Sequence, residues 1–454
     1  EAAPFINLIE GTPEHTYLHA QREKLGGYLP VRKPSMTTLK IPELSAFDAM
    51  LKDTGEREMS STMAFVRMLN VLVKDKELGK HIVPIVPDES RTFGMEGMFR
   101  QLGIWSHVGQ KYTPEDASQL MYYKEAVNGQ IFQEGINEPG AMSTWIAAAT
   151  SYANHGVPMI PFYIYYSMFG FQRTGDLAWA AGDMRARGFI IGGTAGRTTL
   201  NGEGLQHEDG HSQVQADLIP NCESYDPTFA YELAVILQHG MHEMYVEHKD
   251  KYYYITVMNE NYTHPAMPVG IEQDIINGCY LFKSVGNGNI SVNLIGSGSI
   301  LREVIGAADL LSQDFGLKVN VFSATSFNKL HREGMAINRH NMLNPLAPQA
   351  KTFIAQKLEQ TDALVTVAAT DYIRNFADKI REFVPGKYIT LGTDGFGRSD
   401  YRQALREFFE VNRYYVAVAA LKGLADQGLI EANVVADAII KYGINTNKAN
   451  PWEV

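Results

Sequence analysis

The stretch Gln133-Glu-Gly-Ile-Asn-Glu138 contains the residue types and spacing that most clearly indicate chemistry. The residues just before it, Gln130 to Gln133, are typical of a short strand, and the glycine permits a sharp bend because it has no Cβ. An alanine-rich segment, Ala141 to Ala153, predicts a helix, and Pro139 suits its first turn. We therefore expect Glu138 between a strand and a helix. Its carboxylate could cap that helix or take part in proton chemistry.

Two further groups of ionisable residues follow predicted strands. Asp88 and Glu89 come after the apolar run His81 to Val86, and ligands of open α/β sheets bind at the carboxyl ends of strands. A glycine-rich loop, Thr198 to His211, carries two histidines and three acids. The spacing of His207 and His211 could indicate a metal site. Because glycines interrupt the loop, we favour two solvated or substrate-facing histidines.

Composition excludes several classes of protein. The chain has 454 residues, 45% of them hydrophobic and 20% charged, with a net charge of −11. This charge gives no electrostatic footprint for nucleic-acid binding. The two cysteines, Cys222 and Cys279, indicate a reducing compartment, and we expect a cytoplasmic protein. The longest aromatic and apolar run, Met159 to Phe171, is too short to cross a membrane, which takes about 20 residues.

Apolar strand patterns alternate with helical patterns along most of the chain, which predicts parallel sheets. The predicted fold class is α/β, with two consecutive doubly wound, mostly parallel-sheet domains. Turn formers crowd residues 1–55, which we interpret as a linker and an irregular arm. The first domain would span residues 56–265 and the second residues 266–454. The polar segment from Val108 to Tyr123 is either a solvated loop or a mobile lid.

Five long runs make the sequence similar to a known family. They are Pro87 to Gly97, Gln133 to Glu138, Pro161 to Gln172, Gly202 to His211 and Leu391 to Ser399. Together they resemble the pyrimidine-binding and C-terminal domains of homodimeric bacterial pyruvate dehydrogenases. These are thiamine diphosphate enzymes of the transketolase type, and the resemblance implies that fold.

The resemblance implies roles for residues around the cofactor. Glu138 matches the glutamate that hydrogen-bonds N1′ of the aminopyrimidine ring and favours its imino tautomer. Ile136 and Phe169 match residues that line the pyrimidine pocket, with the ring of Phe169 stacked on the cofactor. Asp88 and Glu89 match acidic residues near the cofactor at the dimer interface, thought to relay protons between the two sites.

The resemblance also implies residues that face the substrate. Tyr166 and His207 match polar groups that contact pyruvate and its intermediates, and Glu203 would shape the same loop. The segment from Val108 to about Lys124 matches a mobile active-site loop.

One departure from the family pattern concerns the diphosphate and Mg²⁺. The family binds both through a Gly-Asp-Gly…Asn motif. Asp209-Gly210 and Asp394-Gly395 lack the strand context and the asparagine partner of that motif. The sequence begins at Glu1 in a turn-rich stretch typical of the middle of a longer protein. We therefore expect the diphosphate and Mg²⁺ ligands before Glu1 and no metal ligands in this chain.

The expected function is oxidative decarboxylation of pyruvate with thiamine diphosphate and Mg²⁺. The resemblance implies transfer of the acetyl group to a lipoyl group of the dihydrolipoyl acetyltransferase component, and a homodimer. Alternatives are a 2-oxoglutarate dehydrogenase, a transketolase, or a non-catalytic half-protein that acts in dimer assembly. A sugar phosphate needs several basic groups and a five-carbon dicarboxylate needs an extra cation, so a substrate panel separates the enzymes. We expect neither nucleic acid nor a membrane as a partner.

Overall fold

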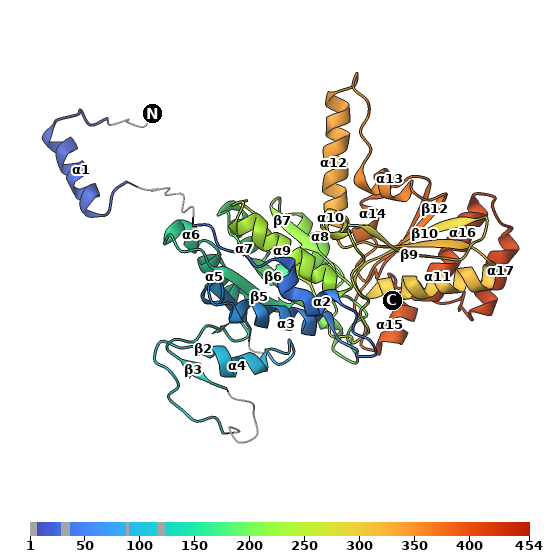
Figure 1. The fold of residues 1–454 in the computed structure, drawn as a ribbon, viewed down its shortest axis with the longest axis horizontal. Helices are drawn as coiled ribbons and strands as arrows, with labels where there is room; N and C mark the ends of the chain where they lie inside the picture. Colours follow the sequence, from blue (N-terminus) through green and yellow to red (C-terminus); the bar gives the residue numbers. More distant parts are fainter. Residues whose placement is uncertain (1–6, 29–36, 88–89, 116–122) are drawn as a thin grey trace.

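A six-stranded sheet forms the centre of the first half of the chain (Figure 1). The computed structural model describes residues 7–28, 37–87, 90–115 and 123–454. Neighbouring strands of this sheet run parallel in the order β4-β1-β5-β6-β8-β7. The strands are β1 Ile82–Val86, β4 Phe132–Gln133, β5 Ile160–Tyr166, β6 Phe189–Gly193, β7 Cys222–Tyr225 and β8 Tyr252–Thr256.

Helices cover both faces of this sheet because successive strand residues point to opposite sides. In β5, Phe162 and Ile164 join the core that includes α3 and α9, whereas Tyr163 and Tyr165 join the core that includes α5 and α7. This layering confirms the predicted doubly wound α/β arrangement. The helices of this half are α2 Asp48–Leu51, α3 Ser61–Lys74, α4 Glu96–Leu102, α5 Glu138–Ala149, α6 Ser151–Asn154, α7 Gly170–Asp183, α8 Ser212–Asp217 and α9 Ala230–Tyr245.

A five-stranded sheet forms the centre of the second half, in the order β13-β12-β10-β11-β9. Its strands run parallel except β9, which pairs antiparallel with β11. The strands are β9 Tyr280–Val285, β10 Ser291–Gly296, β11 Lys318–Ser323, β12 Val365–Ala369 and β13 Lys387–Leu391. The helices are α10 Glu272–Asn277, α11 Leu301–Phe315, α12 Phe327–Leu343, α13 Phe353–Leu358, α14 Asn375–Asp378, α15 Arg402–Phe408, α16 Arg413–Asp426 and α17 Ala432–Lys441.

Smaller elements complete the fold. Two short parallel strands, β2 Ile104–Trp105 and β3 Glu125–Ala126, form a separate ribbon beside the first sheet (Figure 1). Turns of 3₁₀ helix are η1 Leu44–Phe47, η2 Gly79–His81, η3 Leu205–His207, η4 Gly298–Ile300 and η5 Arg381–Phe383. None of the helices in the described part of the chain is long and apolar enough to cross a membrane.

Two parts of the predicted linker and irregular arm, residues 1–55, have regular or buried structure. Helix α1 Pro13–Lys24 forms there with no buried residue, because Thr12 accepts a hydrogen bond from the backbone of His15 and a proline starts the helix. Leu39, Phe47 and Met50 are buried in the core of the first half. The domain limits at residues 55 and 265 stay a prediction.

Buried ion pairs join the two halves. Arg406 of α15 pairs with Glu260 of the first half, and its Nη1 lies 3.7 Å from Oε1 of Glu303 in α11. All three residues are less than a tenth exposed. Burial acts to raise the pKa of Glu260, but the hydrogen bond and charge of Arg406 lower it below its usual value. Arg406 therefore neutralises carboxylates from both halves at once.

We expect Arg406→Ala to lower the free energy of unfolding by about 1–3 kcal/mol, because buried Glu260 and Glu303 each lose one cationic partner and keep only Arg302 and Arg413. Urea unfolding of the chain measures this change. Lys422→Ala is the control, since Lys422 pairs with Asp426 on the exposed surface of α16 and we expect no measurable shift. Equal shifts for both variants would contradict the assignment.

A second buried carboxyl between the halves makes stability depend on pH. Asp226 follows β7, and its Oδ1 accepts hydrogen bonds from Thr256 at 2.7 Å and from Tyr372 of the second half at 3.4 Å. Burial raises the pKa of Asp226 to about 7. Between pH 4 and 7 the folded state therefore keeps a proton that the unfolded state has released.

We expect the free energy of unfolding to fall as pH rises through this range, by up to about 1.4 kcal/mol per pH unit from this group. Asp226→Asn has no carboxyl to titrate, so its urea midpoint should depend less steeply on pH between 5 and 7. Identical slopes for the variant and the wild type would show that Asp226 does not titrate there.

Candidate active site

Glu138 occupies the junction that the sequence predicted. Strand β4 ends at Gln133, Gly135 adopts a φ of 69°, and Glu138 is the first residue of α5. The side chain of Asn137 accepts the backbone N–H of Gly140 at 3.2 Å and so caps the helix. The alternative that Glu138 itself is the capping side chain is therefore wrong.

The carboxylate of Glu138 instead binds an arginine that the sequence analysis missed. Nη1 of Arg173, in α7, lies 2.6 Å from Oε1 of Glu138, and the side chain of Glu138 is only 10% exposed. The guanidinium carbon of Arg173 also lies 4.2 Å from the centre of the Phe169 ring. A signal was present in the sequence, since residues four apart on a helix face the same side and Arg173 follows Phe169 at that spacing.

Three predicted residues meet in an aromatic cluster. The ring of His207 lies 5.4 Å from that of Tyr166 and 5.1 Å from that of Phe169, centre to centre, in edge-to-face geometry. Tyr166 ends β5, Phe169 precedes α7, and His207 comes from the loop after β6. The cluster is joined to Glu138 through Arg173 and Phe169.

The position of this group follows from the order of the strands. The chain passes from β1 to β4 on one side of the sheet and returns to β5 on the other side of β1. Such a reversal leaves a crevice at the carboxyl ends of the strands, where ligands of α/β sheets bind. Glu138 and the Tyr166 cluster follow the ends of β4 and β5 at this place.

The imidazole of His207 lies beside a carboxylate. Its Nδ1 is buried without a hydrogen bond and lies 3.6 Å from Oε2 of Glu203, which is half exposed. The hydroxyl of Tyr166 donates to Oγ1 of Thr92 at 3.2 Å. Thr92 is a second neighbour that the sequence analysis did not identify, although it lies in one of the runs that carry the resemblance.

The remaining predicted residues either have other surroundings or lie outside the described residues. Ile136 is on the turn before Glu138 and is 70% exposed. Asp88 and Glu89 lie outside the described residues, as do residues 116–122 of the segment predicted as a loop or lid. His211 contacts the side-chain amide of Gln172 at 2.7 Å, away from His207. Within the described ranges, no group of three or more His, Cys, Asp or Glu residues could hold a metal ion.

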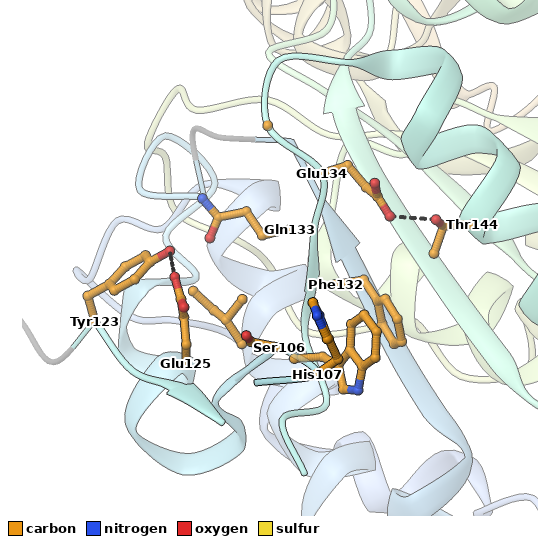
Figure 2. A pocket seen from close by; sticks show the side chains of 11 residues that line it. Ser106, His107, Tyr123, Glu125, Phe132, Gln133, Glu134 and Thr144 are labelled. Carbon is orange, nitrogen blue, oxygen red and sulfur yellow. Dashed lines mark hydrogen bonds between the residues drawn. The ribbon is translucent and has the colours of Figure 1, made fainter. Parts of the chain in front are cut away.

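A cavity of about 440 Å³ is lined in part by Gln133, Glu134 and Gly135 of the Glu138 motif (Figure 2). Its walls include Trp105, which stacks on Phe132 at 5.4 Å, and two carboxylates, Glu125 and Glu134. Glu134 accepts a hydrogen bond from Thr144 of α5 at 2.5 Å. The motif therefore lines this cavity with residues 133–135 and places Glu138 against Arg173.

Burial shapes the protonation of the groups around Glu138. It raises the pKa of Tyr163 well above its usual range, and the charges of Glu138 and Glu134 act in the same direction. Tyr163 therefore stays neutral, and its hydroxyl lies 3.3 Å from the backbone oxygen of Glu138, to which it donates. Arg173 is the cation that faces the carboxylate.

Comparison with known proteins identifies the family. The pyruvate dehydrogenase E1 component middle domain matches residues 39–265, and the transketolase-like C-terminal domain matches residues 278–412. The pyruvate dehydrogenase E1 component of Cupriavidus necator is 61% identical over 100% of this chain and 51% of its own length. That of Pseudomonas aeruginosa is 58% identical over 100% of this chain and 52% of its own length.

Solved structures agree on the fold. Transketolase from Campylobacter jejuni superposes with a TM-score of 0.60 and 16% identity over 83% of this chain and 49% of its own. The chain spans about half the length of the relatives that it matches. Because the middle-domain family matches half of the chain and the relatives are similar along its whole length, this chain belongs to the pyruvate dehydrogenase E1 component family.

Proposed function

We propose that this chain supplies the pyrimidine side of a thiamine diphosphate site that oxidatively decarboxylates pyruvate. The acetyl group would pass to a lipoyl group of the dihydrolipoyl acetyltransferase component of the pyruvate dehydrogenase complex. The observation that carries the proposal is the buried carboxylate of Glu138, paired with Arg173 beside the ring of Phe169. The family of the chain supports the proposal, and so does the fit of these residues to the aminopyrimidine ring of the cofactor.

The residues present fit the aminopyrimidine part of thiamine diphosphate. A carboxylate accepts a hydrogen bond from a protonated ring nitrogen, and an aromatic side chain provides a face for stacking. Glu138 and Phe169 supply both groups, and the exposed Ile136 adds an apolar surface on the same turn. When bound, the cofactor supplies the electron sink that lets CO₂ leave a 2-oxoacid. We assign the diphosphate and Mg²⁺ to the half of the relatives that this chain does not match.

Each residue of the chain has a separate task in this proposal. Arg173 holds the carboxylate of Glu138 in place, so that its other oxygen can accept a hydrogen bond. His207 contributes its imidazole to the substrate side of the cluster, and the hydroxyl oxygen of Tyr166, whose proton is donated to Thr92, can accept a hydrogen bond there. Asp88 and Glu89 stay proposed groups near the cofactor. A homodimer with shared sites and a cytoplasmic location also stay proposals.

Charge around the site favours a small substrate over the alternatives. Among the described residues around Glu138, the cation is Arg173, and its charge is already paired with the Glu138 carboxylate. A sugar phosphate or a second substrate carboxylate would need further cations. The described part of the site therefore favours pyruvate over the substrates of a transketolase or a 2-oxoglutarate dehydrogenase.

The direct test is decarboxylation of pyruvate by this chain with thiamine diphosphate, Mg²⁺ and an artificial electron acceptor. If the chain alone is inactive, it should be assayed with the N-terminal half of a full-length relative. We expect Glu138→Ala to lower kcat by roughly 10²-fold or more in the active form, because a hydrogen bond to the reacting system is lost. Near-normal turnover of this variant would overturn the assignment, and preference for 2-oxoglutarate or a sugar phosphate would favour an alternative.

We expect Arg173→Met to lower kcat by roughly tenfold or more, since Glu138 would lose the 2.6 Å contact that holds its carboxylate in place. Arg173→Lys keeps a cation at this position and should retain more activity. Turnover of pyruvate by the active form measures both variants. Full activity of Arg173→Met would show that Arg173 does not position Glu138.

A further inference from the structure

The loop that carries His207 is held mainly by the second half of the chain. We call residues 196–211 the histidine segment. Both of its ends are buried, and its middle, from Asn201 to Gln206, is mostly exposed. The segment follows β6 of the first half, yet its hydrogen bonds reach residues after β12 and β13 of the second half.

The start of the segment is bound by Asp371, which follows β12. The backbone N–H of Arg197 donates to the backbone oxygen of Asp371 at 3.1 Å, and that of Thr198 donates to its Oδ2 at 3.3 Å. The hydroxyl of Ser299 donates a hydrogen bond to the same Oδ2 at 3.0 Å. The approach is close, since a Cβ on Gly196 would lie 2.3 Å from Oδ2 of Asp371.

The end of the segment is bound in the same way. Oε2 of Glu208 accepts the backbone N–H of Arg398, beyond β13, at 2.7 Å. The backbone oxygen of Gly210 accepts the N–H of Ile373 at 2.7 Å. Glu208 is 1% exposed and adjacent to His207. The position of His207 is therefore fixed one residue away from a contact with the second half.

Arg197 connects the two ends. Its Nη1 donates to the backbone oxygen of Gly395 at 2.6 Å, and its Nη2 would lie 2.0 Å from a Cβ on Gly210. The guanidinium thus fills the space beside Gly210 that a side chain would otherwise occupy. Hydrogen bonds therefore hold the start and the end of the histidine segment, and the Arg197 side chain packs between these two ends.

We propose that Glu208 and Asp371 are positioning residues that hold His207 against Tyr166 and Phe169. This inference rests on the proposed function for its catalytic consequence. It gives the second half of the chain a part in the active site, through contacts with the loop rather than with the substrate. Glu208 acts at the residue next to His207, and Asp371 acts at the start of the segment.

The protonation of Glu208 decides which substitution is conservative. Burial raises the pKa of this carboxyl to about 8. At pH 7 the neutral form predominates, and Glu208→Gln copies its shape and can still accept the N–H of Arg398. Glu208→Ala removes the acceptor. The pair of variants therefore separates the hydrogen bond from the side chain's charge.

A double-mutant cycle tests the catalytic part of the inference. Turnover of pyruvate is measured for Glu208→Ala and Glu208→Gln, each alone and combined with His207→Ala, in the reconstituted enzyme. If Glu208 acts through His207, Glu208→Ala should lower kcat by roughly tenfold alone and by less than about twofold in the His207→Ala background. Glu208→Gln should restore kcat to within about twofold of the wild type. The same fold loss in both backgrounds would overturn a positioning role.

Hydrogen–deuterium exchange of the chain alone tests the contacts without any activity. Glu208→Ala should speed exchange of the backbone amides in residues 203–208 by roughly tenfold or more. Glu243→Ala is the matched control, because Glu243 is another buried carboxylate but binds Lys249 and Tyr253 outside the segment. Unchanged exchange in Glu208→Ala would overturn the inference. Faster exchange in a protein that never turns over pyruvate would support the contacts and overturn only the proposed function.

Two glycines of the segment provide a second comparison that does not depend on Glu208. Gly196→Ala brings a Cβ into Oδ2 of Asp371, whereas Gly202→Ala meets nothing within 4 Å, and both have a positive φ. We expect faster exchange across the segment in the first variant only. Equal effects would show that backbone strain, and not the contact with Asp371, controls the segment.

Discussion

The ion pair between Glu138 and Arg173 is the interaction on which the rest of the candidate site depends. A carboxylate that is 10% exposed is costly to keep charged unless a cation and hydrogen bonds compensate for the loss of water. Arg173 provides that cation and also packs on Phe169, so one side chain links the charge of Glu138 to the aromatic cluster. The turn at Gly135 and the cap at Asn137 then place the carboxylate without using it to start the helix.

The sheet order explains why these residues meet although they are distant in the sequence. Glu138, Tyr166 and His207 each follow a different strand of the first sheet, and parallel strands end at one edge. A reversal of strand order at β1 opens that edge. The fold therefore brings together side chains from three crossover connections, and each of them can change without disturbing the core between the strands.

The second half of the chain contributes through polar contacts across a buried interface. Arg406 neutralises carboxylates of both halves, and Asp226 and Asp371 hold hydroxyl and backbone groups from the opposite side. These groups are held to their present partners, because a buried polar atom that loses its hydrogen-bond partner costs free energy. The same contacts that join the halves also reach the loop of His207. Stability at the interface and geometry at the site are thus coupled.

Much of the fold could be predicted from local patterns. Ser60 accepts the N–H of Met63 and starts α3, and the apolar run that ends at Val86 is a buried parallel strand. Helix α9 was missed because thirteen of its sixteen residues are buried, so it has no polar face to produce a helical period. Helix α1 was missed because a turn-rich composition concealed a capped start at Thr12.

The sequence by itself determined the class of the fold, the strand-to-helix junction at Glu138 and the family. These follow from spacing, glycine and proline positions and short motifs, all of which act over a few residues. Only the tertiary structure decided that Asn137 caps the helix, that Arg173 pairs with Glu138, and that the second half holds the loop of His207. Residues far apart in sequence have no local signal for one another. Their contacts are fixed by strand order and by the need to pair buried charge, which act only once the chain has folded.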